Sequence, residues 1–137
     1  MKKGIRTSIG IKILTGVIAL FLLLTGAFLF YVSDYYHAVD SVTGSGCREE
    51  PEEKYGALIY GPADAEVALV FYPGGKVEYT AYQPLMEKIA EKGILCILPK
   101  MPFNLAVFDV NAADKYISDY PKVSHWYVGG HSLGGSM

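Results

Sequence analysis

The sequence predicts an α/β fold, a mainly parallel sheet with helices on both faces, preceded by one N-terminal transmembrane helix. Three observations predict it. Residues 13–32 carry no charge, apolar segments bounded by Gly and Pro alternate with amphipathic segments after residue 56, and Gly-rich turns follow two of the apolar segments. Strands that alternate with helical crossovers favour parallel pairing, with helices covering both faces of the sheet.

Composition narrows the class of protein. The chain has 137 residues, of which 51% are hydrophobic and 19% charged, and its formal net charge is −2. The length allows one ordinary domain, and the apolar content excludes intrinsic disorder. Two cysteines are too few for a disulfide framework or a four-cysteine zinc site. The slightly acidic balance argues against a nucleic-acid partner, because such proteins carry a basic face.

The uncharged segment 13–32, ILTGVIALFLLLTGAFLFYV, predicts a transmembrane anchor in the lipid bilayer. About 20 helical residues span the roughly 30 Å hydrocarbon core, where a helix satisfies its own backbone polar groups. Residues 1–12 form a basic flank, and acidic residues follow from Asp34. This asymmetry predicts a single-pass cell-membrane protein with a cytoplasmic N-terminus and an extracytoplasmic remainder. The flanking cations are Lys2, Lys3, Arg6 and Lys12.

Two alternatives remain for this segment, a cleaved signal peptide and a buried core helix. A signal peptide normally has an apolar stretch of roughly 7–15 residues followed by a small-x-small cleavage site. Here the nearest triplet of small residues, Thr25-Gly26-Ala27, lies inside the apolar run. A core helix would not need a basic flank on one side only. The anchor is therefore the preferred interpretation.

Residues 33–56 predict a linker between the anchor and a domain over residues 57–137. The linker is rich in small and polar residues and lacks sustained periodicity. Its acidic run surrounds Pro51 and consists of Glu49, Glu50, Glu52 and Glu53. A metal site is the alternative interpretation of this run, but no His or Asp lies at ligand spacing, so a solvated charge run is expected.

The domain contains four segments that predict strands and two that predict crossover helices. Continuous apolar runs bounded by Gly or Pro are typical of strands buried on both faces. Apolar residues three and four positions apart are typical of helices. The predicted strands are 57–60, 67–72, 94–98 and 125–128, and the predicted helices are 81–93 and 105–120.

The ends of the two helices carry recognisable signals. Pro84 suits the first turn of the first helix, and Gly93 ends it. Asn104 can cap the second helix, and Pro121 ends it. The residues predicted to face the sheet are Tyr82, Leu85, Met86, Ile89 and Ala90 in the first helix, and Leu105, Phe108, Ala112, Tyr116 and, as a further candidate, Ile117 in the second.

The Gly-rich turns 73–75 and 129–135 each follow a predicted strand. In open α/β sheets, sites gather at the carboxyl ends of the strands. The second turn contains Gly130-x-Ser132-x-Gly134. A sharp strand-to-helix turn exposes a serine hydroxyl as a nucleophile, and the glycines leave room for neighbouring main chain. The alternative is a Gly-rich turn with an idle serine.

A serine nucleophile needs donors for the negative charge that develops on the acyl oxygen. The backbone N–H of Leu133 is the expected first oxyanion donor, because it opens the helix after the turn. The turn after the earlier strand is expected to supply the second donor, through the N–H of Gly75 or, alternatively, Lys76.

The segment GGHSLGGSM resembles the nucleophile elbow of the α/β-hydrolase superfamily, in the esterase and lipase manner. The preceding stretch, from VALVFYPGG to FNLAVF, resembles the α/β-hydrolase fold-5 group, which has Pro-Gly-Gly where many lipases have His-Gly. The resemblance covers about residues 55–137, the amino-terminal half of the family's core. It implies hydrolysis of an ester, thioester or related acyl bond through a serine acyl-enzyme, without fixing the substrate.

The resemblance also implies that the catalytic acid and base follow the serine in the chain. No acid or histidine follows Ser132 here, so the chain is expected to be a fragment, truncated after the elbow and nearly inactive alone. His131 is expected to shape the elbow, because adjacent side chains on a tight turn point apart. The acids before the serine are expected to be solvated helix charges: Asp109, Asp114 and Asp119.

The sequence thus predicts a membrane-anchored serine hydrolase that acts on a small acyl substrate through Ser132. A non-catalytic, membrane-tethered binding protein with a hydrolase-like fold is the alternative, because one fold can host either role. No metal or organic cofactor is implied. The oligomeric state stays open.

Overall fold

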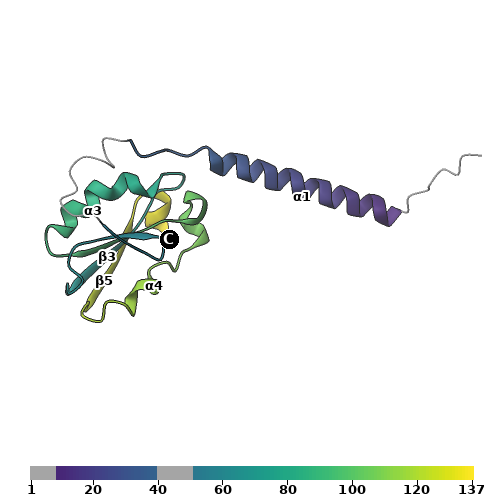
Figure 1. The fold of residues 1–137 in the computed structure, drawn as a ribbon. Helices are drawn as coiled ribbons and strands as arrows, with labels where there is room; N and C mark the ends of the chain where they lie inside the picture. The colour runs from purple at the N-terminus through teal and green to yellow at the C-terminus, as the bar shows by residue number, and fades with distance from the viewer. Residues whose placement is uncertain (1–8, 40–50) are drawn as a thin grey trace, which may run out of the picture. The chain divides into compact units, whose positions relative to one another are not determined.

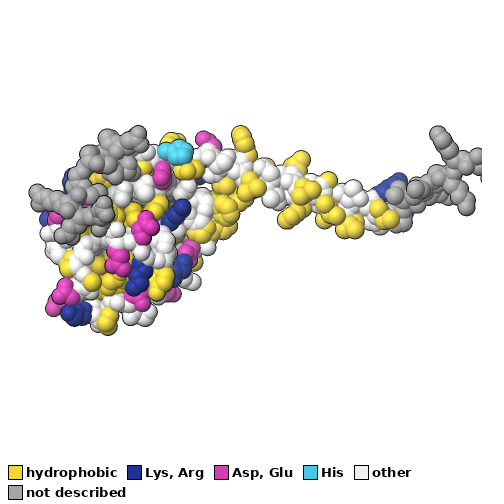
Figure 2. Space-filling view, in the orientation of Figure 1, with side chains coloured by type: hydrophobic (Ala, Val, Ile, Leu, Met, Phe, Trp, Pro, Cys, Tyr) yellow, Lys and Arg dark blue, Asp and Glu magenta, His cyan; other side chains and the backbone are white. Residues whose placement is uncertain are grey.

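The computed structural model describes residues 9–39 and 51–137, which fall into two compact units, Met1–Asp34 and Tyr35–Met137. The described part of the first unit forms the helix α1 (Ile9–Ser33), which begins four residues before the predicted segment and includes Lys12 (Figure 1). Apolar side chains line α1 and are exposed (Figure 2). The helix is long and apolar enough to cross a membrane, a test that a signal sequence also passes. Most of the predicted basic flank lies outside the described residues.

The second unit is built on a five-stranded sheet with strand order β1-β2-β4-β3-β5. Strand β3 pairs in parallel with β4 and β5, whereas β2 pairs antiparallel with β4 and β1. The sheet is therefore mixed, and the predicted parallel pairing holds for three strands. The strands are β1 (Glu52–Lys54), β2 (Ala57–Tyr60), β3 (Val67–Tyr72), β4 (Leu95–Pro99) and β5 (His125–Gly130).

Strand β1 corrects the linker predicted over residues 33–56. A two-residue turn joins β1 to β2, and both of its residues, Tyr55 and Gly56, have positive φ (50° and 75°). Positive φ at both positions fits the tight hairpin turn that matches the twist of the strands. At the other end of the predicted linker, Tyr36 forms a parallel bridge to Val77. Residues 40–50, with Cys47, Glu49 and Glu50, lie outside the described residues.

Helices cover both faces of the sheet (Figure 1). On one face, helix α3 (Gln83–Ala90) buries Met86 against Leu58, Cys96 and Leu98. A 3-10 turn, η1 (Tyr79–Tyr82), leads into α3, and Gly93 follows it at φ 79°. The apolar spacing therefore predicted this crossover helix. Leu85, which was also predicted to face the sheet, is instead 44% exposed.

The helix predicted over residues 105–120 is not formed as one element. Two 3-10 turns, η2 (Pro102–Asn104) and η3 (Ala106–Phe108), precede the short helix α4 (Asp114–Ile117). Asn104, the predicted helix cap, lies in the left-handed region at φ 54°. Phe108 and Ile117, predicted to face the core, are about half exposed, whereas Ala112 and Tyr116 are buried against the sheet face opposite α3.

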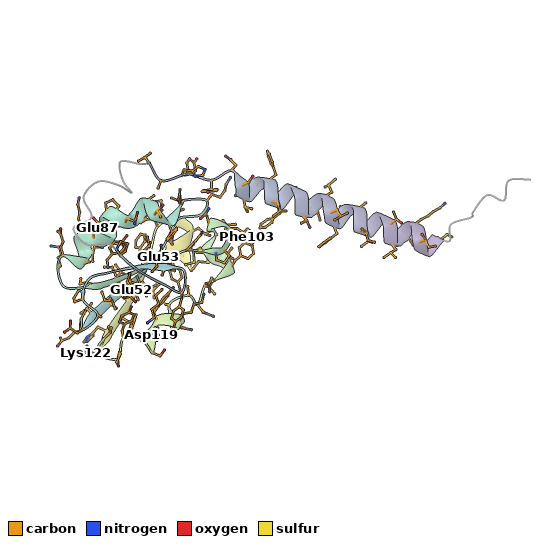
Figure 3. The ribbon with its side chains drawn as sticks, viewed as in Figure 1. Glu52, Glu53, Glu87, Phe103, Asp119 and Lys122 are labelled. Atoms are coloured by element: carbon orange, nitrogen blue, oxygen red, sulfur yellow. The ribbon has the colours of Figure 1, made fainter. Side chains whose placement is uncertain are left out.

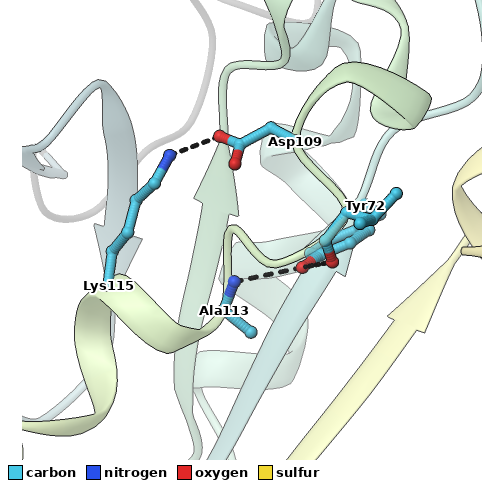
Figure 4. Close-up of polar contacts among 5 residues, drawn as sticks. Tyr72, Asp109, Ala113 and Lys115 are labelled. Atoms are coloured by element: carbon cyan, nitrogen blue, oxygen red, sulfur yellow. Dashed lines mark hydrogen bonds and ion pairs between the residues drawn. The ribbon is translucent and has the colours of Figure 1, made fainter.

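The buried hydroxyl of Tyr72 explains this interruption. It donates to the carbonyl oxygen of Val110 (2.9 Å) and accepts the N–H of Ala113 (3.0 Å; Figure 4). In a continuous helix the Val110 carbonyl would accept the N–H four residues later, but Asp114 donates to Asn111 instead (3.1 Å). The core tyrosine therefore takes over backbone partners that a helix would have used.

Candidate active site

The chain turns sharply between β5 and the 3-10 helix η4 (Ser132–Ser136). Ser132 sits at the corner with φ 51°, a conformation that costs a non-glycine residue on the order of 1–3 kcal/mol. The turn is held by two bonds of its neighbour His131, whose N–H donates to Tyr72 O (3.1 Å) and whose carbonyl accepts the N–H of Gly134 (2.9 Å). The strained residue of this turn is therefore Ser132 itself.

The two glycines that flank the serine let main chain approach main chain. A Cβ on Gly130 would lie 2.5 Å from the carbonyl carbon of Gly134. A Cβ on Gly134 would lie 2.2 Å from the backbone oxygen of Tyr72, at the end of β3. Backbone cannot yield as a flexible side chain does, so only glycine fits at these positions. The G-x-S-x-G spacing therefore packs the elbow directly against the end of the neighbouring strand.

The turn after β3 faces the elbow. A Cβ on Gly75 would lie 3.0 Å from Cδ2 of Leu133, so the structure brings together two residues that the sequence predicted as oxyanion donors. Among the described residues, no acceptor is found for the N–H of Gly75. By contrast, the N–H of Lys76 donates to the carbonyl oxygen of Asn104 (2.8 Å). Of the two alternatives for the second donor, the geometry favours Gly75.

A chain of hydrogen bonds through Tyr82 joins the two turns. The N–H of Gly74 donates to Tyr82 Oη (3.1 Å), and Tyr82 Oη lies 3.0 Å from His131 Nδ1. A Cβ on Gly74 would lie only 2.7 Å from that ring nitrogen. The apolar spacing predicted Tyr82 as a helix residue that faces the sheet. That pattern reports burial of the ring and does not indicate a hydrogen bond of its hydroxyl. The ring nitrogen of His131 is thus engaged by Tyr82.

No histidine in the described part of the chain is hydrogen-bonded to Ser132. His125 Nδ1 lies 2.9 Å from Ser124 Oγ, and His37 Nδ1 lies 3.5 Å from a carboxylate oxygen of Glu78. The arrangement therefore offers a strained, exposed serine and backbone donors, while the described residues do not supply the general base.

Two of the three aspartates in the second crossover form ion pairs rather than standing as solvated charges. Asp109 contacts Lys115 (Figure 4). The side chain of Asp119 is labelled in Figure 3. Its Oδ2 lies 2.9 Å from Lys54 Nζ, and this bond lowers the pKa of Asp119 and raises that of Lys54. These pairs hold the crossover and β1 in place, at a distance from the elbow in the chain.

Neither metal chemistry nor thiol chemistry is suggested by the described side chains. Within residues 9–39 and 51–137, no three His, Cys, Asp or Glu side chains gather as metal ligands would. Cys96 is buried in β4, and burial raises the pKa of its thiol to about 12. A thiol with such a pKa stays protonated and is a poor nucleophile.

Comparison with known proteins supports one family. No curated protein and no solved structure gives a significant match to the chain. The alpha/beta hydrolase family model matches residues 68–137, half of the chain, and this range includes all of β3 except Val67, the turn at Gly75 and the turn at Ser132. The chain therefore belongs to the alpha/beta hydrolase family.

Proposed function

We propose that this protein is a membrane-anchored serine hydrolase that cleaves an ester or related acyl bond through a Ser132 acyl-enzyme. The observation that carries the proposal is the strained corner at Ser132. Glycines packed against neighbouring backbone and a facing turn that offers an amide support the corner. Backbone strain in a non-glycine residue persists where surrounding structure enforces it, and such sites are often functional.

The chemistry follows from the groups at the corner. Ser132 Oγ adds to the acyl carbon, and the carbonyl oxygen becomes an oxyanion. The serine proton passes to a general base, a group that the described residues do not supply. The N–H groups of Leu133 and Gly75 are the proposed donors to that oxyanion, with Lys76 the less favoured second donor. The bond to the leaving alcohol then breaks as the alcohol takes up a proton. Water attacks the resulting serine ester and releases the acid.

The localisation rests on α1. We propose that it remains as a single-pass anchor, with residues 13–32 in the bilayer, the N-terminus cytoplasmic and the hydrolase domain outside. The test is a membrane preparation of the protein with an N-terminal epitope tag. A retained tag that resists alkaline extraction, and external protease access to the domain, support the anchor. Loss of the tag on maturation would instead establish a cleaved signal sequence.

The nucleophile is tested by labelling the full-length membrane protein with a fluorophosphonate, which phosphonylates activated serines. Wild type is expected to react, and Ser132→Ala is expected not to react. Ser136→Ala is the matched control, because Ser136 lies in the same 3-10 helix and its Oγ only donates to Leu133 O (2.9 Å). Labelling that survives Ser132→Ala contradicts the assignment, and a folded wild type that never reacts favours the non-catalytic binding protein.

A further inference from the structure

The segment that follows α1 in the chain lies against the residues that follow Gly75. Tyr36 forms a parallel bridge to Val77. Its N–H donates to Lys76 O (2.8 Å), and its carbonyl accepts the N–H of Glu78 (2.9 Å). Residues 35–38, which we call the strap, thus add a short extended segment to residues 76–78. The sequence had suggested only a spacer there.

A carboxylate secures the strap from the other side. Glu78 Oε2 accepts the N–H of Ala38 (2.9 Å) and lies 3.5 Å from His37 Nδ1. The bond from Ala38 is the main reason why the pKa of Glu78 lies below its ordinary value of 4.5, with smaller contributions from Thr80 and His37. Charge-assisted bonds of this kind are stronger than neutral ones. Residues 36 and 38 are therefore both fixed to the segment after the turn.

The strap holds one side of a strained residue. Lys76 has φ 59°, although it is not a glycine. Its carbonyl oxygen accepts the Tyr36 N–H, and its own N–H donates to Asn104 O, each at 2.8 Å. Such a conformation persists only where the surroundings enforce it. The N–H of Gly75 belongs to the peptide between Gly74 and Gly75, one peptide before the one that ends at the Lys76 N–H. Release of Lys76 would relax this turn and, with it, the direction of the Gly75 N–H.

We propose that the strap, residues 35–38, is a positioning element of the active site that holds the Gly75 amide in place through Lys76. The inference rests on the proposed function, because positioning has meaning only if Ser132 reacts. On this proposal, the segment that follows α1 in the chain contributes to the activity of the hydrolase domain. Loosening it is expected to slow acylation even when the protein is in detergent and the serine, Leu133 and Gly75 are unchanged.

The test compares two neighbouring proline substitutions in the full chain. Ala38→Pro removes the N–H that Glu78 accepts, whereas Val39→Pro alters an exposed residue for whose N–H no acceptor is found among the described residues. Ala38→Pro is expected to lower the maximal rate of phosphonylation about tenfold, with the half-saturating probe concentration unchanged. Val39→Pro is expected to react like wild type.

A second pair of variants, both at Glu78, tests the same hydrogen bond without introducing a proline that could disturb folding. Glu78→Ala removes the acceptor, while Glu78→Gln keeps an oxygen that can accept the Ala38 N–H. Glu78→Ala is expected to repeat the tenfold loss, and Glu78→Gln to restore most of the rate. Amide exchange of Lys76 is expected to accelerate in Ala38→Pro and Glu78→Ala, although its acceptor Asn104 is untouched.

The outcomes separate the two proposals. A wild type that does not react contradicts the proposed function and the positioning role with it. A wild type that reacts, together with Ala38→Pro and Glu78→Ala variants that react equally fast while Lys76 exchange accelerates, overturns the positioning role alone. Slower reaction in both variants, restored in Glu78→Gln, supports the strap.

Discussion

The turns after β3 and β5 both place a non-glycine residue at positive φ, but they are held in different ways. At the elbow, the strained Ser132 is flanked by two glycines of its own motif: Gly130 and Gly134 pack against one another, and Gly134 also packs against Tyr72 at the end of β3. At the facing turn, Lys76 is fixed by Tyr36 and Asn104, which are far from it in the chain. A local motif can thus encode one half of a site while distant segments shape the other half.

The largest effect is expected from Gly134→Ala, which breaks the packing between the two turns. The new Cβ would meet the Tyr72 oxygen at 2.2 Å, so backbone must move. We expect a loss of roughly 3 kcal/mol in the free energy of unfolding, or no folded protein. Gly129→Ala is the control, because its Cβ would meet only side chains, Leu69 Cδ1 at 3.4 Å and Phe71 Cδ2 at 4.0 Å. Equal denaturant midpoints for the two variants would contradict this account.

Next in size is Tyr82→Phe, which cuts the chain of bonds between the turns. It leaves Gly74 N–H and His131 Nδ1 without their shared partner. We expect a loss of about 1–2 kcal/mol in unfolding free energy and a several-fold slower phosphonylation of Ser132. Tyr79→Phe is the control, since no hydrogen bond of the Tyr79 hydroxyl is found within the described residues. If the Tyr82→Phe protein is as stable and as reactive as this control, the Tyr82 hydroxyl has no role in holding the two turns together.

A glycine at either strained corner tests whether the two turns store similar strain. Ser132→Gly, compared with Ser132→Ala, and Lys76→Gly, compared with Lys76→Ala, are each expected to be more stable by about 1 kcal/mol, because glycine adopts positive φ without the Cβ penalty. Thermal unfolding in parallel gives the differences. If alanine is the more stable at one corner, that corner is not under strain.

The smallest effect is expected from titrating Glu78, whose carboxylate accepts the Ala38 N–H of the strap. Its pKa is lowered in the folded protein by the Ala38 bond, so its contribution to stability is present above pH 4.5 and is lost as pH falls through the lowered pKa. The side chain is 32% exposed, which weakens the contribution. Melting temperatures of wild type and Glu78→Gln should differ at neutral pH and converge in acid. A gap that widens in acid would contradict this sign.

The two crossovers between parallel strands show how far local pattern reaches. Helix α3 was predicted because its apolar spacing, Pro84 and Gly93 agree with one another, and the core accepts Met86 as expected. The second crossover also had apolar residues at helical spacing, but residues 107–111 include β-branched residues, Asn and Asp, which are weaker helix formers. There the Tyr72 hydroxyl could compete for the backbone groups of Val110 and Ala113.

By itself the sequence determined the chain's apolar segments, the first crossover helix and the glycine-flanked turn at Ser132, because each depends on residues close together in the chain. Only the tertiary structure decided the antiparallel hairpin at β1, the breaks in the second crossover, the bond between Tyr82 and His131, and the strap on Lys76. These depend on single hydrogen bonds between residues 38 or more positions apart, or on which neighbour a strand finds. Periodicity carries no information on such partners, since it reports burial and not the group that a buried polar atom meets.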